Sequence, residues 1–243
     1  MLSYNSIGNN YFYQHDCGPV STNWLILKNE TILTYIIIMI VKITLLITSF
    51  FTGAIILSYE ILMIHMITPY FGSSHIIWAN IIATVIIALA IGYKYGGTLA
   101  DRYPNYQSLY NILILGCCLF SIAYIGNHTV CETIIASMKL LPINHYWTVF
   151  FASLIVSLLL FCFPIMLLGC CTPYIIRLLL TSMTNVGKIS GLVYGISTIG
   201  SLAGLIVTSL IALPLLGLKT SLIIVTVGHI IINTITLGIT KIK

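Results

Sequence analysis

The sequence from Lys42 to Met66 reads KITLLITSFFTGAIILSYEILMIHM. Inside this stretch Glu60 is the only acidic side chain, and the rest is predominantly apolar. A helix that crosses the hydrocarbon layer of a bilayer needs about twenty apolar residues, whereas a barrel strand shows about ten residues of alternating character. The stretch therefore predicts a transmembrane helix at 42–66.

The composition of the whole chain agrees with a membrane environment. Of its 243 residues, 59% are hydrophobic and 6% are charged, and the mean hydropathy is +1.07. An ordinary soluble domain has about a quarter of its residues charged, because its surface faces water. Lipid offers no partner for backbone polar groups, so spanning segments must satisfy them internally. We therefore expect an all-α integral membrane fold with the lipid bilayer as its main partner.

Further apolar runs lie on either side of the first. The six predicted spans are 42–66, 76–95, 109–125, 149–168, 189–213 and 222–239. Residues 1–32 are polar and aromatic and are predicted to form an N-terminal arm, while 33–243 form the membrane domain. The stretch just before Lys42 is either interfacial or a continuation of the first helix. Residues 126–146 are predicted to be a loop with a short surface helix, and Pro164 is expected to kink the fourth span.

The distribution of basic residues predicts the orientation, because cytoplasmic ends retain Lys and Arg. With the N-terminus inside, only Lys139 and Lys219 fall on the outer side. The inner side receives Lys28, Lys42, Lys94, Arg102, Arg177, Lys188, Lys241 and Lys243. We expect a multi-pass protein of the cell (inner) membrane with both termini in the cytoplasm. The net charge of +5 is then a topology signal, and no nucleic-acid partner is expected.

Glu60 is the candidate polar site within the membrane, together with His65. An ionisable group inside a span is costly and by default a functional candidate. Its predicted depth in the outer half of the bilayer makes His65, His75, Lys139 and Lys219 the available partners. His65 is about 140° around the helix, so a contact within the same helix is expected to be poor. The structural alternative is a carboxyl that is protonated or hydrogen-bonded.

Small residues predict how the helices pack. Glycines spaced by four lie on one helix face and let another backbone approach closely. These sets are Gly92/Gly96, Gly187/Gly191/Gly195 and Gly200/Gly204. We expect them to pack within one bundle rather than form a dimer seam. The seven cysteines show no metal-ligand spacing and are expected to be small buried residues. No metal and no cofactor are expected.

Several ordered motifs resemble one known family. They are Gly53–Leu62, Pro69–Ser74 with Trp78, Gly92–Arg102, Thr172–Leu178 and Gly187–Ser201. From about residue 45 onward the chain resembles the membrane domain fused to spermidine-synthase-like (polyamine aminopropyltransferase-like) proteins. The motif positions are Pro69, Tyr70, Gly72, Trp78, Gly97, Asp101, Arg102, Pro173, Arg177, Gly191, Tyr194, Ser197 and Gly200. His65 departs from the pattern, since the family commonly has Arg there. Gly97 with Asp101 and Arg102 also resembles the inner-loop motif of major-facilitator transporters, of which six helices would be one half.

The resemblance is compatible with two classes of function. In fused relatives a soluble aminopropyltransferase domain follows the membrane part, and this chain stops at Lys243. The first class is a non-catalytic membrane module that anchors or serves a separate aminopropyltransferase-like partner. The second is a small transporter or binding protein for polyamines or other organic cations, acting as a homo-oligomer. Activity within this chain ranks third, because Glu60 is the only acid in the spans and no catalytic pair can be formed.

Overall fold

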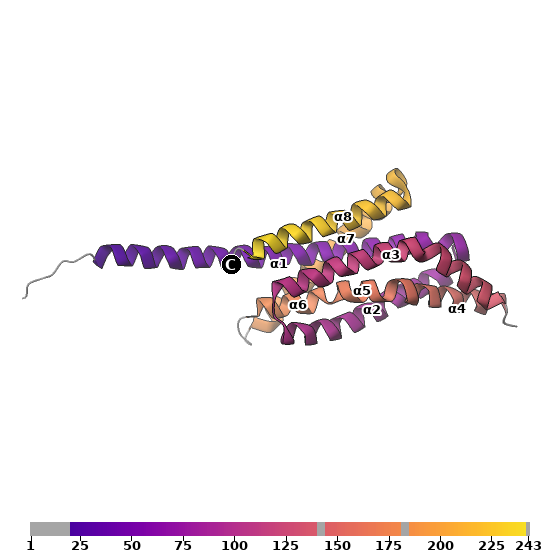
Figure 1. Ribbon diagram of the computed structural model, residues 1–243, viewed down its shortest axis with the longest axis horizontal. Helices are drawn as coiled ribbons and strands as arrows, with labels where there is room; N and C mark the ends of the chain where they lie inside the picture. Colours follow the sequence, from indigo (N-terminus) through magenta and orange to yellow (C-terminus); the bar gives the residue numbers. More distant parts are fainter. Residues whose placement is uncertain (1–19, 140–143, 181–184, 242–243) are drawn as a thin grey trace, which may run out of the picture. The chain divides into compact units, whose positions relative to one another are not determined.

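The computed structural model describes residues 20–139, 144–180 and 185–241, and every regular element in these ranges is a helix (Figure 1). The chain divides into two compact units, Met1–Met39 and Ile40–Lys243. In the first unit most of the described apolar side chains are exposed, among them Tyr35 and Met39. The second unit contains the helical bundle.

The bundle is built from long helices and a few short ones. They are α1 (Val20–Phe71), α2 (His75–Arg102), α3 (Tyr106–Lys139), α4 (His145–Ser157), α5 (Phe163–Gly169), α6 (Cys171–Leu179), α7 (Val186–Ile206) and α8 (Leu213–Lys241). Five apolar stretches of the described residues are long enough to cross a membrane: Thr34–Phe71, His75–Arg102, Tyr106–Met138, His145–Leu179 and Val186–Thr240. The prediction of a multi-pass, all-α membrane protein is confirmed.

The first helix is longer than its predicted span. Helix α1 begins at Val20 and runs without interruption to Phe71, so the stretch before Lys42 continues the helix. Of the predicted arm at 1–32, residues 1–19 lie outside the described residues. At the other end Gly72 adopts a φ of 85°, a left-handed conformation that glycine adopts without steric cost. The chain turns there and enters α2.

The predicted loop at 126–146 is wrong over most of its length, because α3 continues as one helix to Lys139. The polar residues of this stretch are accommodated by the helix. Asn127 is buried and donates a hydrogen bond from Nδ2 to the Met66 carbonyl at 3.0 Å. His128 and Glu132 are exposed, and their side chains meet at 3.4 Å one turn apart. The length of the apolar run therefore underestimated the length of α3, because the helix continues beyond the apolar residues.

Two prolines follow π-helical segments. Pro164 lies in the first turn of α5, directly after the π-helical segment η1 (Leu158–Cys162). Pro214 lies at the start of α8, directly after the second segment, η3 (Val207–Ala212). Proline has no N–H to donate, and its ring clashes with the carbonyl four residues earlier. The wider π-turn separates these groups. A kink was predicted at Pro164, and the structure has a π-helical segment just before it.

The last apolar stretch folds back on itself. Gly217 has a non-helical conformation with a φ of 73°, and Figure 1 shows the ribbon reversing between α7 and α8. Ser58 on α1 accepts a hydrogen bond from Thr208 at 2.8 Å. The adjacent Tyr59 hydroxyl lies 2.9 Å from the Thr226 hydroxyl. The stretch thus has two arms: the first is α7 followed by η3, and the second is α8. Two neighbouring residues of α1 contact both arms, which cover the fifth and sixth predicted spans.

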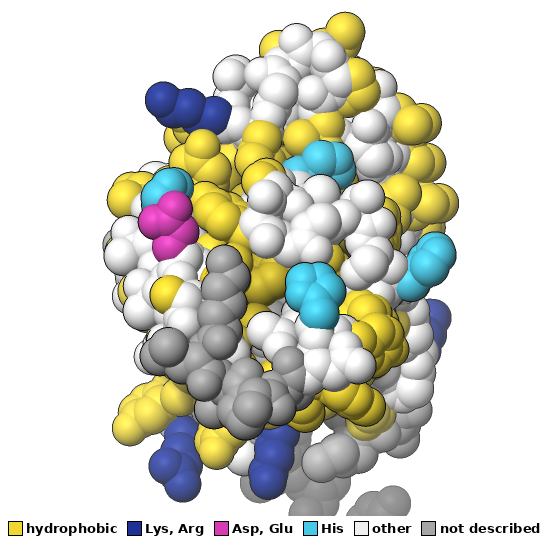
Figure 2. All heavy atoms as spheres, turned by 90° about the vertical axis from the view of Figure 1, so that its right-hand side faces the viewer, with side chains coloured by type: hydrophobic (Ala, Val, Ile, Leu, Met, Phe, Trp, Pro, Cys, Tyr) yellow, Lys and Arg dark blue, Asp and Glu magenta, His cyan; other side chains and the backbone are white. Residues whose placement is uncertain are grey.

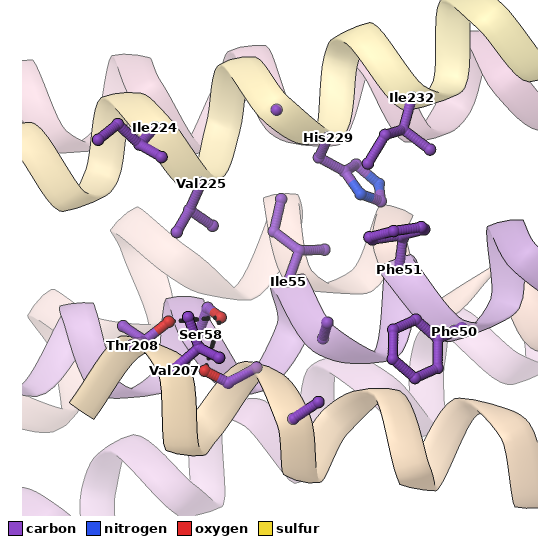
Figure 3. A pocket seen from close by; sticks show the side chains of 14 residues that line it. Phe50, Phe51, Ile55, Ser58, Val207, Thr208, Ile224, Val225, His229 and Ile232 are labelled. Carbon is purple, nitrogen blue, oxygen red and sulfur yellow. Dashed lines mark hydrogen bonds between the residues drawn. The ribbon is translucent and has the colours of Figure 1, made fainter. Parts of the chain in front are cut away.

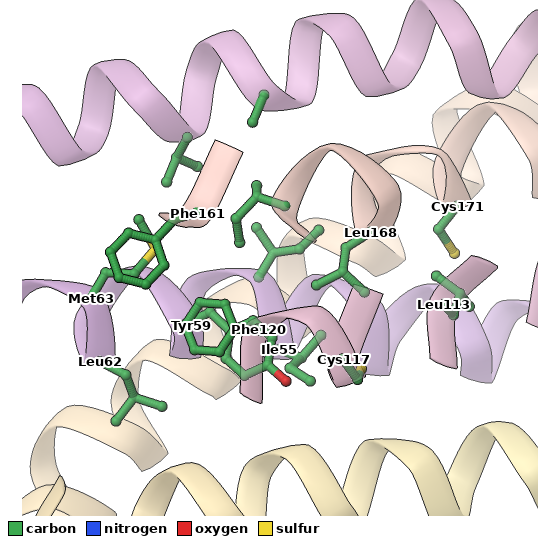
Figure 4. Packing of buried hydrophobic residues seen from close by; sticks show 14 of the residues in the cluster. Ile55, Tyr59, Leu62, Met63, Leu113, Cys117, Phe120, Phe161, Leu168 and Cys171 are labelled. Atoms are coloured by element: carbon green, nitrogen blue, oxygen red, sulfur yellow. The ribbon is translucent and has the colours of Figure 1, made fainter. Parts of the chain in front are cut away.

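Aromatic side chains fill the core between α1, α3 and η1. The Tyr59 ring stacks on Phe120 with centroids 3.6 Å apart, and Phe120 lies 5.6 Å from Phe161 (Figure 4). All three side chains are fully buried. On the other side of the bundle, buried hydroxyls join α2 to α4, with Thr84 and Ser157 at 2.9 Å. Packing in the core thus fixes the orientation of α1 about its helix axis. This orientation determines where the polar residues of α1 point.

Candidate functional site

Glu60 is half-buried on the membrane-spanning part of α1. Its orientation follows from its two neighbours. Tyr59 is held in the core by Phe120 and Thr226, and Ser58 is held against α7 and η3 by Gly204 and Thr208. Successive residues of a helix are about 100° apart, so Glu60 points away from both contacts. Its carboxylate thereby stays outside the packed core, on a helix flank.

The carboxylate of Glu60 has no hydrogen-bonding or ion-pair partner among the residues that the structure describes. Ion pairs within the described ranges form at two places, Asp101 with Arg177 and His128 with Glu132. Neither His75 nor Lys219 pairs with Glu60, and the side chain of Lys139 lies outside the described residues. A carboxylate left without a cation in a low-dielectric setting has a strong tendency to acquire one or a proton.

The structure does not bring His65 to Glu60. His65 is exposed, and its Nδ1 lies 2.8 Å from the Ile61 carbonyl, one turn back on the same helix. This agrees with the poor same-helix contact expected from the spacing. The two residues predicted as one intramembrane polar site are therefore two separate positions on α1.

The predicted outer end of the bundle is rich in histidine. His65, His75, His128 and His145 are all exposed there, and Figure 2 shows histidine side chains on this face, with an acidic side chain beside one of them. The Tyr70 ring meets His128 edge-on at 5.9 Å. Trp78 and Pro69 are also exposed near this end. Pro69 and Trp78, two of the motif positions, therefore lie on the surface next to the turn at Gly72 and not in a buried pocket.

The opposite end is braced by the acidic and basic motif residues. The Arg177 Nε on α6 donates to the Asp101 Oδ1 on α2 at 2.7 Å. The Tyr174 hydroxyl also donates to the Tyr103 carbonyl, just after α2. The ion pair is half-exposed, and such pairs add about 1 kcal/mol or less to stability. Its role is to fix the end of α2 against α6, while the Arg102 side chain stays exposed.

Glycines of the motifs form two close-packed seams. A β-carbon at Gly53, Gly200 or Gly204 would lie within 2.1 Å of a backbone oxygen across the α1–α7 interface. At Gly92 and Gly96 it would lie 2.3 and 2.6 Å from backbone atoms of Met166 and Cys170. These glycines let helix backbones touch, as the spacing of Gly92/Gly96 and Gly200/Gly204 led us to expect.

Another set of glycines departs from the prediction. A β-carbon at Gly187, Gly191 or Gly195 would meet no atom of the described residues within 4 Å. At Gly97 the nearest atom is the Pro173 Cβ at 4.0 Å. The i, i+4 spacing shows which glycines share a face, but not whether a helix packs on that face. No described helix of this unit packs on the Gly187–Gly195 face. Beside it, the ring centroids of Tyr194 and Tyr93 lie 6.5 Å apart.

The cysteines behave mostly as predicted. Cys117, Cys131, Cys170 and Cys171 are buried, whereas Cys118 is exposed on α3. In the described ranges no group of three or more His, Cys, Asp or Glu side chains could hold a metal ion.

A buried polar stripe on α8 was missed by the sequence reasoning. Its members are Thr226, His229, Asn233, Thr236 and Thr240, all at most 5% exposed. They are spaced by three and four residues, so they lie on one helix face. That spacing was the available signal, since polar residues with helical periodicity in an apolar span indicate an inward face. Within the described ranges, the His229 Nε2 and both polar side-chain atoms of Asn233 have no hydrogen-bond partner.

Comparison with known proteins finds no match to a protein-family model, to a curated protein or to a solved structure.

Proposed function

We propose that this chain is a non-catalytic membrane module that crosses the bilayer six times and binds an organic cation at Glu60. The reversal at Gly217 supports the six crossings, since each arm of the last apolar stretch contacts α1 over a similar depth. Six helices with this kind of packing would correspond to one half of a major-facilitator transporter. A second copy would then supply the other half that flanks a central site in that architecture.

The observation that carries the cation site is the state of the Glu60 carboxylate. It lies half-buried within a span and lacks a cationic partner among the described residues. An amine would supply both the missing positive charge and N–H donors. The resemblance to spermidine-synthase-like membrane domains points to polyamines as the class of cation. Glu60 must be ionised when the amine is bound.

Glu60→Gln is expected to abolish stabilisation by amines while leaving the fold intact. Glutamine keeps the shape and loses the charge, and Glu60 makes no hydrogen bond or ion pair with the residues that the structure describes. The measurement is a thermal-shift series on purified protein with putrescine, spermidine and butylamine. A ligand at one hundred times its Kd adds about 2.7 kcal/mol to the stability of the form that binds it. The wild type should therefore show a rising melting temperature, and Glu60→Gln a flat one.

Glu132→Gln is the matched control, because Glu132 is an exposed acid outside the predicted spans, beside His128. It should keep the full amine response. The response of the wild type should weaken as the pH is lowered, because protonation removes the charge that attracts the amine. A wild type that responds to no amine at any pH would contradict the cation site.

The second candidate function is the anchoring of a separately encoded aminopropyltransferase-like protein. The observation that favours it is the braced end of the bundle, where the Asp101–Arg177 pair holds α2 and α6 together beneath exposed basic side chains. Lys94, Arg102 and Lys188 are exposed near this end. A soluble partner with an acidic surface would fit there, and this role would remain if amines fail to bind.

A further inference from the structure

We propose that a cavity between α1, α6 and the start of α7 binds the headgroup of an anionic phospholipid from the surrounding membrane. Its lining includes Lys42 and Leu46 from α1, Leu179 from α6, and Lys188 and Leu192 from α7. We call it the lysine cavity. The site is separate from Glu60, and the inference does not depend on the proposed cation binding.

Two positive charges line the lysine cavity without a carboxylate to balance them. Within the described ranges, neither Lys42 nor Lys188 forms an ion pair. Asp101, which lies near this end of the bundle, is paired with Arg177 at 2.7 Å. Glu60 lies about 27 Å further along α1, at 1.5 Å per residue. Like charges beside one cavity repel each other, and an anion between the two lysines would replace this repulsion by attraction.

The two lysines lie at the depth where lipid phosphate groups are found. Lys42 begins the first predicted span, and Lys188 directly precedes the fifth. Because both side chains line one cavity, they lie at a similar depth in the membrane. Two apolar spans therefore begin at this level, and the headgroup region adjoins the hydrocarbon layer there. Basic pockets between membrane helices at this border bind anionic headgroups.

The walls of the lysine cavity suit the apolar part of a lipid. Leu179 is buried and Leu46 is half-buried, whereas Leu192 is exposed at the edge. Ile199 and Ile206 follow Leu192 at intervals of seven residues and are also exposed. Seven residues are close to two helical turns, so these three side chains lie on one face of α7. An acyl chain can lie along this face while its headgroup stays at the lysines.

The size of the lysine cavity fits a headgroup but not a whole lipid. Its volume is about 260 Å³, roughly that of nine water molecules. This is room for a phosphate with the glycerol carbons that carry it, and the acyl chains remain outside, along α7. Asn185 also lines the cavity, and its amide can donate to a phosphate oxygen.

A second cavity, between α1, α7 and α8, lacks charged side chains (Figure 3). Phe50, Phe51 and Ile55 line it from α1, and Val225 lines it from α8. A phosphate would lose its hydration there without gaining a counter-charge. The combination of cations and apolar walls that an anionic lipid needs is therefore found in the lysine cavity.

The first test is lipid binding by the whole purified chain, measured by native mass spectrometry. Equal amounts of dioleoylphosphatidylglycerol and dioleoylphosphatidylcholine are added in detergent. The two lipids share their acyl chains, but the choline group carries a positive charge that the lysines repel. The wild type should retain phosphatidylglycerol about tenfold more than phosphatidylcholine, since each lysine near the headgroups contributes to the attraction.

Two matched double variants separate the cavity from the general surface charge. Lys42→Gln with Lys188→Gln removes both charges of the cavity, and this variant should retain the two lipids equally. Both lysines are exposed, so the melting temperature without added lipid should stay that of the wild type. Lys94→Gln with Arg102→Gln removes two exposed charges of α2 that do not line the cavity. This control should keep the tenfold preference, and so should Glu60→Gln, which separates this site from the cation site.

The second test distinguishes a lipid from a free phosphate. In a thermal-shift series, phosphatidylglycerol should raise the melting temperature of the wild type, because a ligand at one hundred times its Kd raises the ratio of folded to unfolded protein about a hundredfold. Glycerol phosphate at the same concentration should leave it unchanged, since it carries the same phosphate without the chains that lie along α7.

A preference for phosphatidylglycerol that persists without Lys42 and Lys188 would overturn the proposal. Its loss in the Lys94 and Arg102 control would do the same, because the preference would then follow overall charge. Equal stabilisation by glycerol phosphate and phosphatidylglycerol would mean that the cavity takes a free phosphate and not a lipid. A wild type without any lipid preference would also contradict the site and leave Lys188 to the acidic partner considered above.

Discussion

Gly200→Ala is expected to separate α7 from α1. The added β-carbon would lie 2.0 Å from the Phe50 carbonyl oxygen and 2.7 Å from its carbon. These are backbone atoms of a long helix, so they cannot move aside as a flexible side chain would. Overpacking of a well-packed interior costs about 1–3 kcal/mol and sometimes more, and we expect a loss of at least about 3 kcal/mol here. The measurement is the melting temperature of the purified protein in detergent.

Gly191→Ala is the matched control on the same helix. Its β-carbon would meet nothing within 4 Å in the part of the chain that the structure describes, and alanine is about 1 kcal/mol better than glycine in a helix interior. The glycine spacing predicted that Gly191, like Gly200, packs closely against a neighbouring helix, and the structure corrects this for Gly191. Equal melting temperatures for the two variants would show that the α1–α7 seam is not formed.

Gly96→Ala should have a comparably large effect on the other seam of the bundle. Its β-carbon would lie 2.6 Å from the Cys170 Cα and 2.8 Å from the Cys170 carbonyl oxygen. The end of α2 would be forced off α6, and the Asp101–Arg177 contact at 2.7 Å would be lost with it. We expect a fall in melting temperature of the same order as for Gly200→Ala.

The next residue offers an internal control. Gly97→Ala places its β-carbon 4.0 Å from the Pro173 Cβ, which is an ordinary van der Waals contact. This variant should be neutral or slightly stabilising, although both glycines belong to one motif. A fall in melting temperature for Gly97→Ala but not for Gly96→Ala would mean that α2 is rotated relative to the structure described here.

The sequence was sufficient for the membrane class and for a multi-pass, all-α architecture. Hydropathy measures composition along the chain, and twenty apolar residues in a row leave few structural choices. It failed at 126–139, where α3 continues with polar residues on its surface. A helix beyond an apolar span is stabilised by its own backbone hydrogen bonds and by contacts such as Asn127 with the Met66 carbonyl, which hydropathy does not register.

The candidate sites were predictable only in part. Glu60 stood out because a lone acid in a span is conspicuous, and the Asp101–Arg177 contact joined two motifs that the sequence had singled out separately. His229 was missed, because a single histidine among apolar residues carries little signal until its face is known. The rotation of each helix about its axis is decided by packing, for example by Tyr59 on Phe120. That rotation separates Gly200, which is packed, from Gly191, which is open.

The proposed six crossings place the ends of the helices on defined sides of the membrane. With an even number of crossings, the C-terminus lies on the same side as the turn after Arg102. The turn at Gly72 and the reversal at Gly217 then lie together on the other side. If the last apolar stretch crossed only once, the C-terminus would join Gly72 instead.

The measurement that tests this most directly is the accessibility of short epitope tags in the full-length protein in intact and permeabilised cells. Tags are inserted after Ser73, after Pro104 and after Leu216, and one is added to the C-terminus. We predict that the tags after Ser73 and Leu216 bind antibody in intact cells, whereas the tag after Pro104 and the C-terminal tag bind only after permeabilisation. A C-terminal tag that is accessible in intact cells together with the tag after Ser73 would contradict the six-crossing bundle.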